Sequence, residues 1–268
     1  MKNIFIHEQK MLRKSTWAWT ITLCTLAFFI FSLFPAFTRD AAVTRNLLEA
    51  FPEVIRELVG ISLESFFSPI GFYAFVFAYV MLLGSIQAMN NGLLLLSKES
   101  RDKTIDFLLS KPITRNQVLT AKLLAGVDAL FTTNIIYYLF SSLLIVFFAK
   151  NTFHSIDFLS LALINFTLLF VQCVFYALGL LLSVILPKIK SVIAITLTTV
   201  FSFFILDMFN SVVKDEKLRY ILPYKYFDPI YILSHHAYEI VYLTITVLFV
   251  ITATIVTYVL YRKKDFLV

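Results

Sequence analysis

The sequence is poor in charge, in glycine and in cysteine. Charged residues make up 15% of the 268-residue chain, and it contains six glycines and two cysteines. Soluble domains carry about 25% charged residues. Here 59% of the residues are hydrophobic and the mean hydropathy is +0.83. So much apolar surface cannot be hidden in a soluble domain of this length, so the composition excludes an ordinary soluble protein.

Several sequence signatures are also missing. No Gly-x4-Gly-Lys-Ser/Thr phosphate loop occurs, so the usual nucleotide-binding site is not expected in this chain. Cys24 and Cys173 both fall in apolar stretches, which favours neither a disulfide framework nor a thiolate metal site. Basic residues do not gather with exposed aromatics, so the net charge of +6 does not indicate nucleic-acid binding.

Long apolar stretches dominate what is present. A helix needs about 20 apolar residues to cross a hydrocarbon core of about 30 Å. Six stretches meet this requirement, at about 15–38, 65–97, 119–149, 158–187, 191–213 and 240–261. Continuous apolar runs, without the alternation of barrel strands, indicate helices. We therefore expect an all-α membrane protein with six transmembrane helices, in a single transmembrane domain over residues 1–268.

Lysine and arginine divide unequally between the two sides of this six-span arrangement. Eight of the 23 fall on one side: Arg39, Arg45, Arg56, Lys150, Lys214, Lys217, Arg219 and Lys225. The other fifteen lie on the side that holds both termini and the 98–122 loop. Because cytoplasmic loops carry the excess of basic residues, we expect a cell-membrane protein with both termini in the cytoplasm.

Amphipathic segments flank the spans. Before the first span, apolar residues among charged ones predict a separate helix on the cytoplasmic membrane surface. Outside, the apolar residues between Leu47 and Leu58 recur at helical spacing, which predicts one interfacial helix with Pro52 near its start. The aromatic last outer loop suits a headgroup-level belt or a re-entrant segment. Such segments commonly serve as structural anchors.

The 97–122 loop is the long cytoplasmic stretch with an ordered pattern. Ile105, Leu108 and Leu109 fall at i, i+3 and i+4, which predicts a short helix with an apolar edge. Pro112 ends it, and Thr114 with Gln117 predicts a capping box that starts the next helix. The pattern fits a surface that contacts a partner, but it fits equally well a connecting hairpin resting on the membrane.

This loop resembles that of the type-2 ATP-binding-cassette (ABC) exporter permeases. The resemblance rests on Glu99, on Thr104 to Arg115 (Thr-Ile-Asp-Phe-Leu-Leu-Ser-Lys-Pro-Ile-Thr-Arg) and on Lys122. Two later motifs support it, Leu222 to Pro229 and Tyr261 to Asp265, so it covers the whole chain. Lys103 stands where glycine is usual, and Glu99 stands alone where an acidic pair is common.

The resemblance implies a permease half that pairs with a second half and with cytoplasmic ATPase subunits. ATP would be bound by that partner, and this chain would need no cofactor of its own. The loop would be the coupling helix, with these residues contacting the ATPase: Glu99, Thr104, Ile105, Leu108, Leu109, Pro112, Arg115 and Lys122.

Ionisable and amide groups inside spans are costly and need an explanation. Asp128, Asn134 and Asp207 are candidates for a substrate or ion pathway, and a structural role is the alternative. For the two aspartates, water or a nearby basic group could compensate the charge. His235 and His236, followed by Glu239, raise the alternative of an intramembrane metal-dependent hydrolase, although no standard zinc spacing is present. A membrane scaffold without transport is a third possibility.

Overall fold

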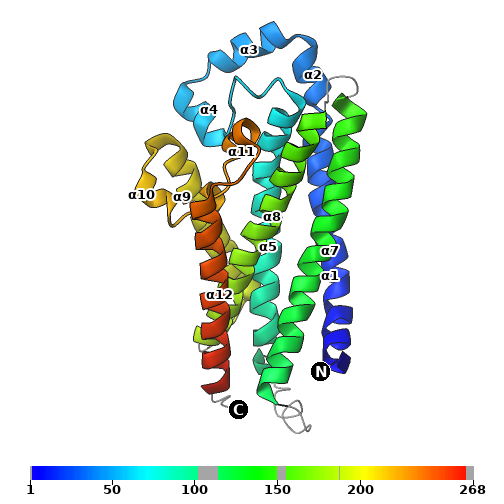
Figure 1. The fold of residues 1–268 in the computed structure, drawn as a ribbon, viewed down its shortest axis with the longest axis vertical. Coiled ribbons are helices and arrows are strands. Elements are labelled where there is room, and N and C mark those ends of the chain that lie inside the picture. Colours follow the sequence, from blue (N-terminus) through cyan, green and yellow to red (C-terminus); the bar gives the residue numbers. More distant parts are fainter. Residues whose placement is uncertain (1, 102–113, 150–154, 187, 264–268) are drawn as a thin grey trace.

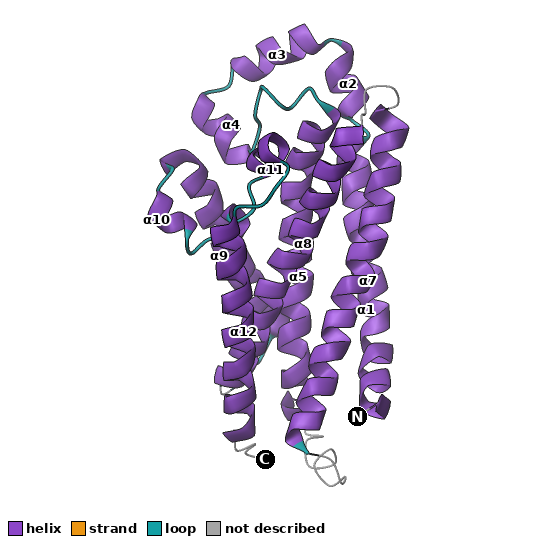
Figure 2. Ribbon diagram, viewed as in Figure 1, coloured by secondary structure: helices purple, strands orange, loops and turns teal. Residues whose placement is uncertain are grey.

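The computed structural model describes residues 2–101, 114–149, 155–186 and 188–263, and in that part of the chain every regular element is helical (Figures 1 and 2). The long helices are α1 (Lys2–Phe31), α5 (Pro69–Arg101), α7 (Arg115–Ala149), α8 (Ser155–Ile185), α9 (Val192–Val213) and α12 (Ile240–Lys263). With α2 joined to α1, each is long and apolar enough to cross a membrane. The all-α class and the six spans are confirmed.

Successive long helices run in opposite directions through the bundle. Figure 1 places the start of α1, the end of α12 and the flanks of the 102–113 segment at one end of the molecule, which we call the terminal end. The opposite end, the far end, carries α2 (Phe34–Arg39), α3 (Ala41–Glu49), α4 (Glu53–Val59), α10 (Glu216–Arg219) and α11 (Pro229–His235). The short 3-10 helix η2 (Pro223–Lys225) also packs at this end against α9.

Helices α5 and α8 form the centre of the bundle, with α1 and α7 paired on one side, α9 against α5, and α12 against α8. Gly92 and Gly179 lie where α5 and α8 cross. A Cβ atom on Gly92 would lie 2.5 Å from the Tyr176 carbonyl oxygen, and one on Gly179 would lie 2.6 Å from that of Met89. The two backbones therefore touch, which only glycine permits at this crossing.

Helix α1 corrects one expectation, because its first turns do not form a separate surface helix. It runs unbroken from Lys2 to Phe31. Its buried positions follow one stripe against α7 and the core: Glu8, Leu12, Thr16, Thr20, Leu23, Ala27 and Phe31. An amphipathic pattern fits a neighbouring helix as well as a membrane surface, and here the apolar stripe packs against protein. The helix ends just before Pro35, which lies at the start of α2 and lacks an amide donor.

The outer amphipathic segment also differs from the expectation of one helix. Pro52 stands at a helix start as predicted, since it is the N-terminal cap of α4, but it also separates α4 from a second helix, α3. The residue before a proline avoids the helical region, so the break falls at Phe51. Helix α4 ends at Gly60, whose φ of +84° is left-handed and suits glycine.

Aromatic residues of the last outer loop pack into the protein. Tyr224, Tyr226 and Phe227 are buried. The Phe227 ring stacks on Phe170 of α8 with the ring centroids 5.3 Å apart, and Tyr224 lies 5.3 Å from Phe175 of the same helix. This loop therefore packs against the middle of α8.

Candidate coupling and pathway sites

Five residues of the expected coupling surface lie outside the described part of the chain: Thr104, Ile105, Leu108, Leu109 and Pro112. Glu99 is described only as part of the α5 backbone. The structure does describe where the loop leaves the bundle, at the end of α5, and where it returns, at Thr114 and the start of α7.

The return point has the predicted capping box. The Thr114 hydroxyl accepts from the Gln117 amide at 3.3 Å, and the Gln117 side-chain oxygen accepts from the Thr114 amide at 3.2 Å. These bonds satisfy two backbone donors that no preceding helical turn could pair. The prediction that a new helix starts here and continues into the third span is confirmed.

Arg115 and Thr120 join the first turns of α7 to the last turns of α12. Arg115 donates from Nη1 to the backbone oxygen of Arg262 at 3.1 Å. That oxygen belongs to the last turn of α12, where carbonyls lack helical partners and carry partial negative charge, so an arginine is favourable there. One turn further along α7, the Thr120 and Tyr258 hydroxyls lie 2.7 Å apart. The loop's return point is thus bound to the chain's C-terminal helix.

Lys122 lies inside the bundle, although the resemblance groups it with the coupling residues. Its side chain is fully buried. The ammonium donates to the Leu95 carbonyl of α5 at 2.7 Å and lies 3.1 Å from the Glu8 carboxylate of α1. A single lysine on α7 therefore connects α1 and α5, which places it in the base of the loop and not on a surface open to a partner.

Glu8 is the partner that sequence reasoning missed. It is 4% exposed, and its second carboxylate oxygen has no hydrogen-bond partner among the residues that the structure describes. The signal in the sequence is the four-residue spacing of Glu8, Leu12, Thr16 and Thr20, which puts the carboxylate on the face of α1 that packs against α7.

Asn134 belongs to a chain of polar side chains that crosses the bundle. Its amide donates to Gln172 of α8 at 2.6 Å, and Gln172 donates to Gln87 of α5 at 3.2 Å. Gln87 donates to Thr133 of α7 at 2.8 Å, whose hydroxyl lies 3.1 Å from that of Thr20 in α1. Four helices are thus linked by hydrogen bonds between side chains, as expected for amides in an apolar bundle.

Asp128 pairs with another helix and not with a basic residue. Its carboxylate accepts from the Gln9 amide of α1 at 2.7 Å. Asp128 lies in the first half of α7, Asn134 lies in the polar chain, and Asp207 lies near the C-terminal end of α9. The three pathway candidates therefore do not form one site.

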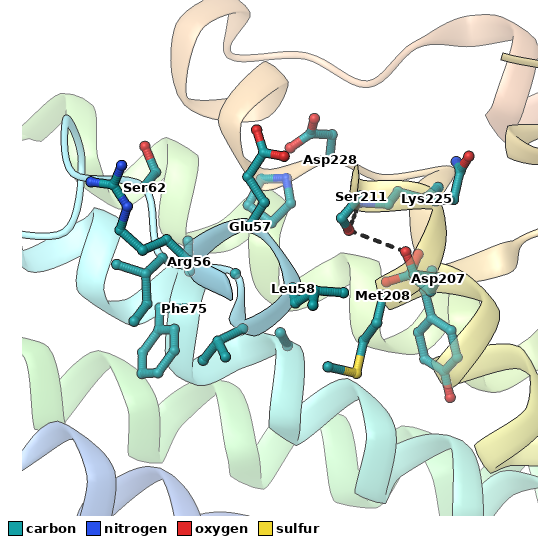
Figure 3. Close-up of a pocket in the computed structure, with 18 of the residues that line it drawn as sticks. Arg56, Glu57, Leu58, Ser62, Phe75, Asp207, Met208, Ser211, Lys225 and Asp228 are labelled. Atoms are coloured by element: carbon teal, nitrogen blue, oxygen red, sulfur yellow. Dashed lines mark hydrogen bonds between the residues drawn. The ribbon is translucent and has the colours of Figure 1, made fainter. Parts of the chain in front are cut away.

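Asp207 lines a cavity of about 820 Å³ at the far end, between α4, the start of α5, the end of α9 and the 214–229 segment (Figure 3). In the described part of the chain, one of its carboxylate oxygens is buried without a hydrogen-bond partner. Ser211 and Lys225 lie beside it, and the Lys225 ammonium donates to the Ser211 hydroxyl at 2.7 Å. Leu58, Phe75 and Met208 supply apolar lining.

Charged side chains surround this cavity. Seven carboxylates line it: Glu53, Glu57, Glu64, Asp207, Asp215, Glu216 and Asp228. Four basic groups accompany them: Arg56, Lys214, Arg219 and Lys225. Lys214 pairs with Glu57 at 2.7 Å, and this hydrogen bond and charge raise the pKa of the Lys214 ammonium. The lining carries an excess of three negative charges.

His235, His236 and Glu239 do not converge. His236 lies 2.9 Å from the Ser160 hydroxyl through Nδ1, while the His235 ring stacks on Tyr231 with centroids 4.1 Å apart. Glu239 pairs with Arg219. Within the described residues, no three His, Cys, Asp or Glu side chains are placed to hold a metal ion.

The comparison with known families agrees with the architecture. Residues 2–266 match the ABC-2 family transporter protein family. No curated protein matches the sequence. Members of this family are membrane components of transporters, typically without a catalytic site of their own. Since the match covers nearly the whole of a chain that folds as six membrane-spanning helices, the protein belongs to the ABC-2 family of transporter permeases.

Proposed function

We propose that this chain is the membrane-spanning half of an ATP-driven exporter, coupled through its 97–122 loop to a separate cytoplasmic ATPase. The observation that carries the proposal is the family match over residues 2–266 in a sequence without a phosphate loop. ATP would then be bound and hydrolysed by the partner. A second permease half, identical or related, would complete the pathway by symmetry.

The base of the loop supports a role in force transfer. Lys122 connects the α7 leg of the loop to α5 and α1, and Arg115 connects it to the end of α12. Helices α1, α5, α7 and α12 are therefore joined close to the place where the ATPase would contact the loop. A load applied to the loop would reach all four without depending on side chains in the lipid phase.

Orientation follows from the basic residues. The helix ends at the terminal end flank the sequence segments that contain the fifteen lysines and arginines of the richer side, so in this proposal the terminal end faces the cytoplasm in the cell membrane. The far-end cavity then opens to the outside. Export, and not import, is the direction that the resemblance to type-2 exporters implies.

The substitution Leu108→Asp tests the coupling helix. If Leu108 is buried against the ATPase, its burial is worth about 1.5–3 kcal/mol. An unpaired carboxylate at the same position in that interface would cost at least as much again. We expect the variant to lose co-purification with the ATPase, or to lose substrate-stimulated ATP hydrolysis, while it still inserts into the membrane.

Two controls separate coupling from general damage. Leu47→Asp makes the same change on exposed α3 at the far end and should leave ATPase association intact. Leu161→Ala, inside a span, should also keep the ATPase bound. Full ATPase binding and turnover by Leu108→Asp would contradict the coupling role. A stable complex with no substrate-stimulated hydrolysis in the unsubstituted protein would favour a scaffold.

A further inference from the structure

We propose that the far-end cavity is a binding site for one amphiphilic organic cation, with Asp207 as its counter-ion. The site itself needs no ATPase, and only its place on an export route rests on the proposed function. The cavity measures about 820 Å³, within the range of sites that hold drug-sized molecules.

Asp207 is the first reason for a cationic ligand. It is the one charged residue of helix α9, less than two turns from the helix end, and within the described residues its buried Oδ1 atom has no hydrogen-bond partner. Its neighbour Ser211 uses its hydroxyl to donate to the Asp207 backbone oxygen at 3.1 Å, not to the carboxylate. An unpaired carboxylate in such surroundings is costly, and a ligand ammonium would provide the missing partner.

The lining as a whole favours the same sign of charge. Its excess of three negative charges attracts cations into the cavity. Two of the four basic side chains already have acidic partners, since Lys214 pairs with Glu57 and Arg219 with Glu239. Lys225, the basic group beside Asp207, directs its ammonium to the Ser211 hydroxyl. A second ammonium can therefore approach the carboxylate.

The cavity wall gives the ligand an orientation. Leu58 and Met208 lie between Asp207 and Arg56 in Figure 3, so an apolar body can rest beside them. Arg56 stands at the opposite side, and its two buried nitrogens Nε and Nη1 have no hydrogen-bond partner within the described ranges. Its positive charge repels a cationic group from that side. The ammonium should therefore lie at Asp207, and the apolar tail should extend toward α4.

Three isosteric probes test the assignment: 4-phenylbutylamine, 4-phenylbutanol and 4-phenylbutyrate. Binding to the purified full chain in nanodiscs would be measured by calorimetry at pH 7, with empty nanodiscs subtracted. We expect one saturable amine site per chain, with affinity about tenfold or more above that of the alcohol, and weaker binding still of the anion. Asp207→Asn should lower the amine affinity about tenfold and leave the alcohol unchanged, which also shows that the cavity is intact.

Asp128→Asn removes the same charge from a span outside the cavity and should not change amine binding. Asp207→Glu should keep most of the preference for the amine. Equal binding of amine and alcohol, or unchanged amine affinity in Asp207→Asn, would overturn the proposal. Because no ATP or ATPase enters this assay, its result is independent of the Leu108→Asp experiment.

Discussion

The buried pair of Glu8 and Lys122 permits a quantitative test of how the loop base is held. Lys122→Met keeps an unbranched side chain, one atom shorter, but removes both the ion pair and the bond to the Leu95 carbonyl. It leaves Glu8 buried, with neither oxygen bonded to a described side chain. Breaking a buried pair in this way costs about 3–5 kcal/mol, so we expect a loss of unfolding free energy in that range.

Glu8→Gln and the double variant complete a double-mutant cycle with Lys122→Met, which measures the interaction energy between Glu8 and Lys122. Glu8→Gln should cost less, about 1–3 kcal/mol, because Lys122 keeps its bond to the Leu95 carbonyl. The double variant removes the orphaned carboxylate as well, so it should be more stable than Lys122→Met alone by about 1 kcal/mol or more.

Unfolding in mixed micelles, titrated with sodium dodecyl sulfate and followed by circular dichroism, measures all four proteins. Lys190→Met, at an exposed position between α8 and α9, is the control and should change the free energy by less than about 0.5 kcal/mol. If the two single losses simply add in the double variant, then Glu8 and Lys122 do not interact, and the reasoning about the loop base fails.

Three other outcomes are expected. Gly179→Val should greatly reduce the yield of folded protein in size-exclusion chromatography, because a side chain there meets the Met89 backbone; a wild-type yield would contradict the crossing. Thr114→Ala should cost about 1 kcal/mol, seen as faster amide hydrogen exchange at Gln117, and unchanged exchange would argue against the cap. In a background without Cys24 and Cys173, a cysteine at Ser100 should resist impermeant thiol reagents in intact cells. Labelling from outside would contradict the cytoplasmic position of the 97–122 loop.

The spans were predictable because crossing a membrane imposes a simple length and composition on the sequence. The start of α7 was predictable for a different reason, since Thr114 and Gln117 are three residues apart and satisfy each other's backbone amides locally. Both predictions depend only on neighbours in the chain. No information about the packing of distant helices was needed.

Partners distant in sequence could not be predicted. The charge of Glu8 and the apolar residues near it fitted a membrane surface, because a single sequence does not specify what covers an amphipathic face. In the structure that face meets α7, so Glu8 finds Lys122, 114 positions away, and Gln9 finds Asp128. The far-end cavity likewise combines α4, α5 and α9, and Asp207 alone gave no indication of Arg56 or Phe75.

The glycine crossing of α5 and α8 has a consequence for how this sequence can change over time. A contact between two backbones offers no rotamer through which a neighbour could adapt to a larger residue. Replacing either Gly92 or Gly179 would push the helices apart, and the remaining glycine would then leave a gap where it now fits. The two positions are therefore expected to accept substitutions together or not at all, so that a paired library at these sites should yield folded variants mainly with small residues at both.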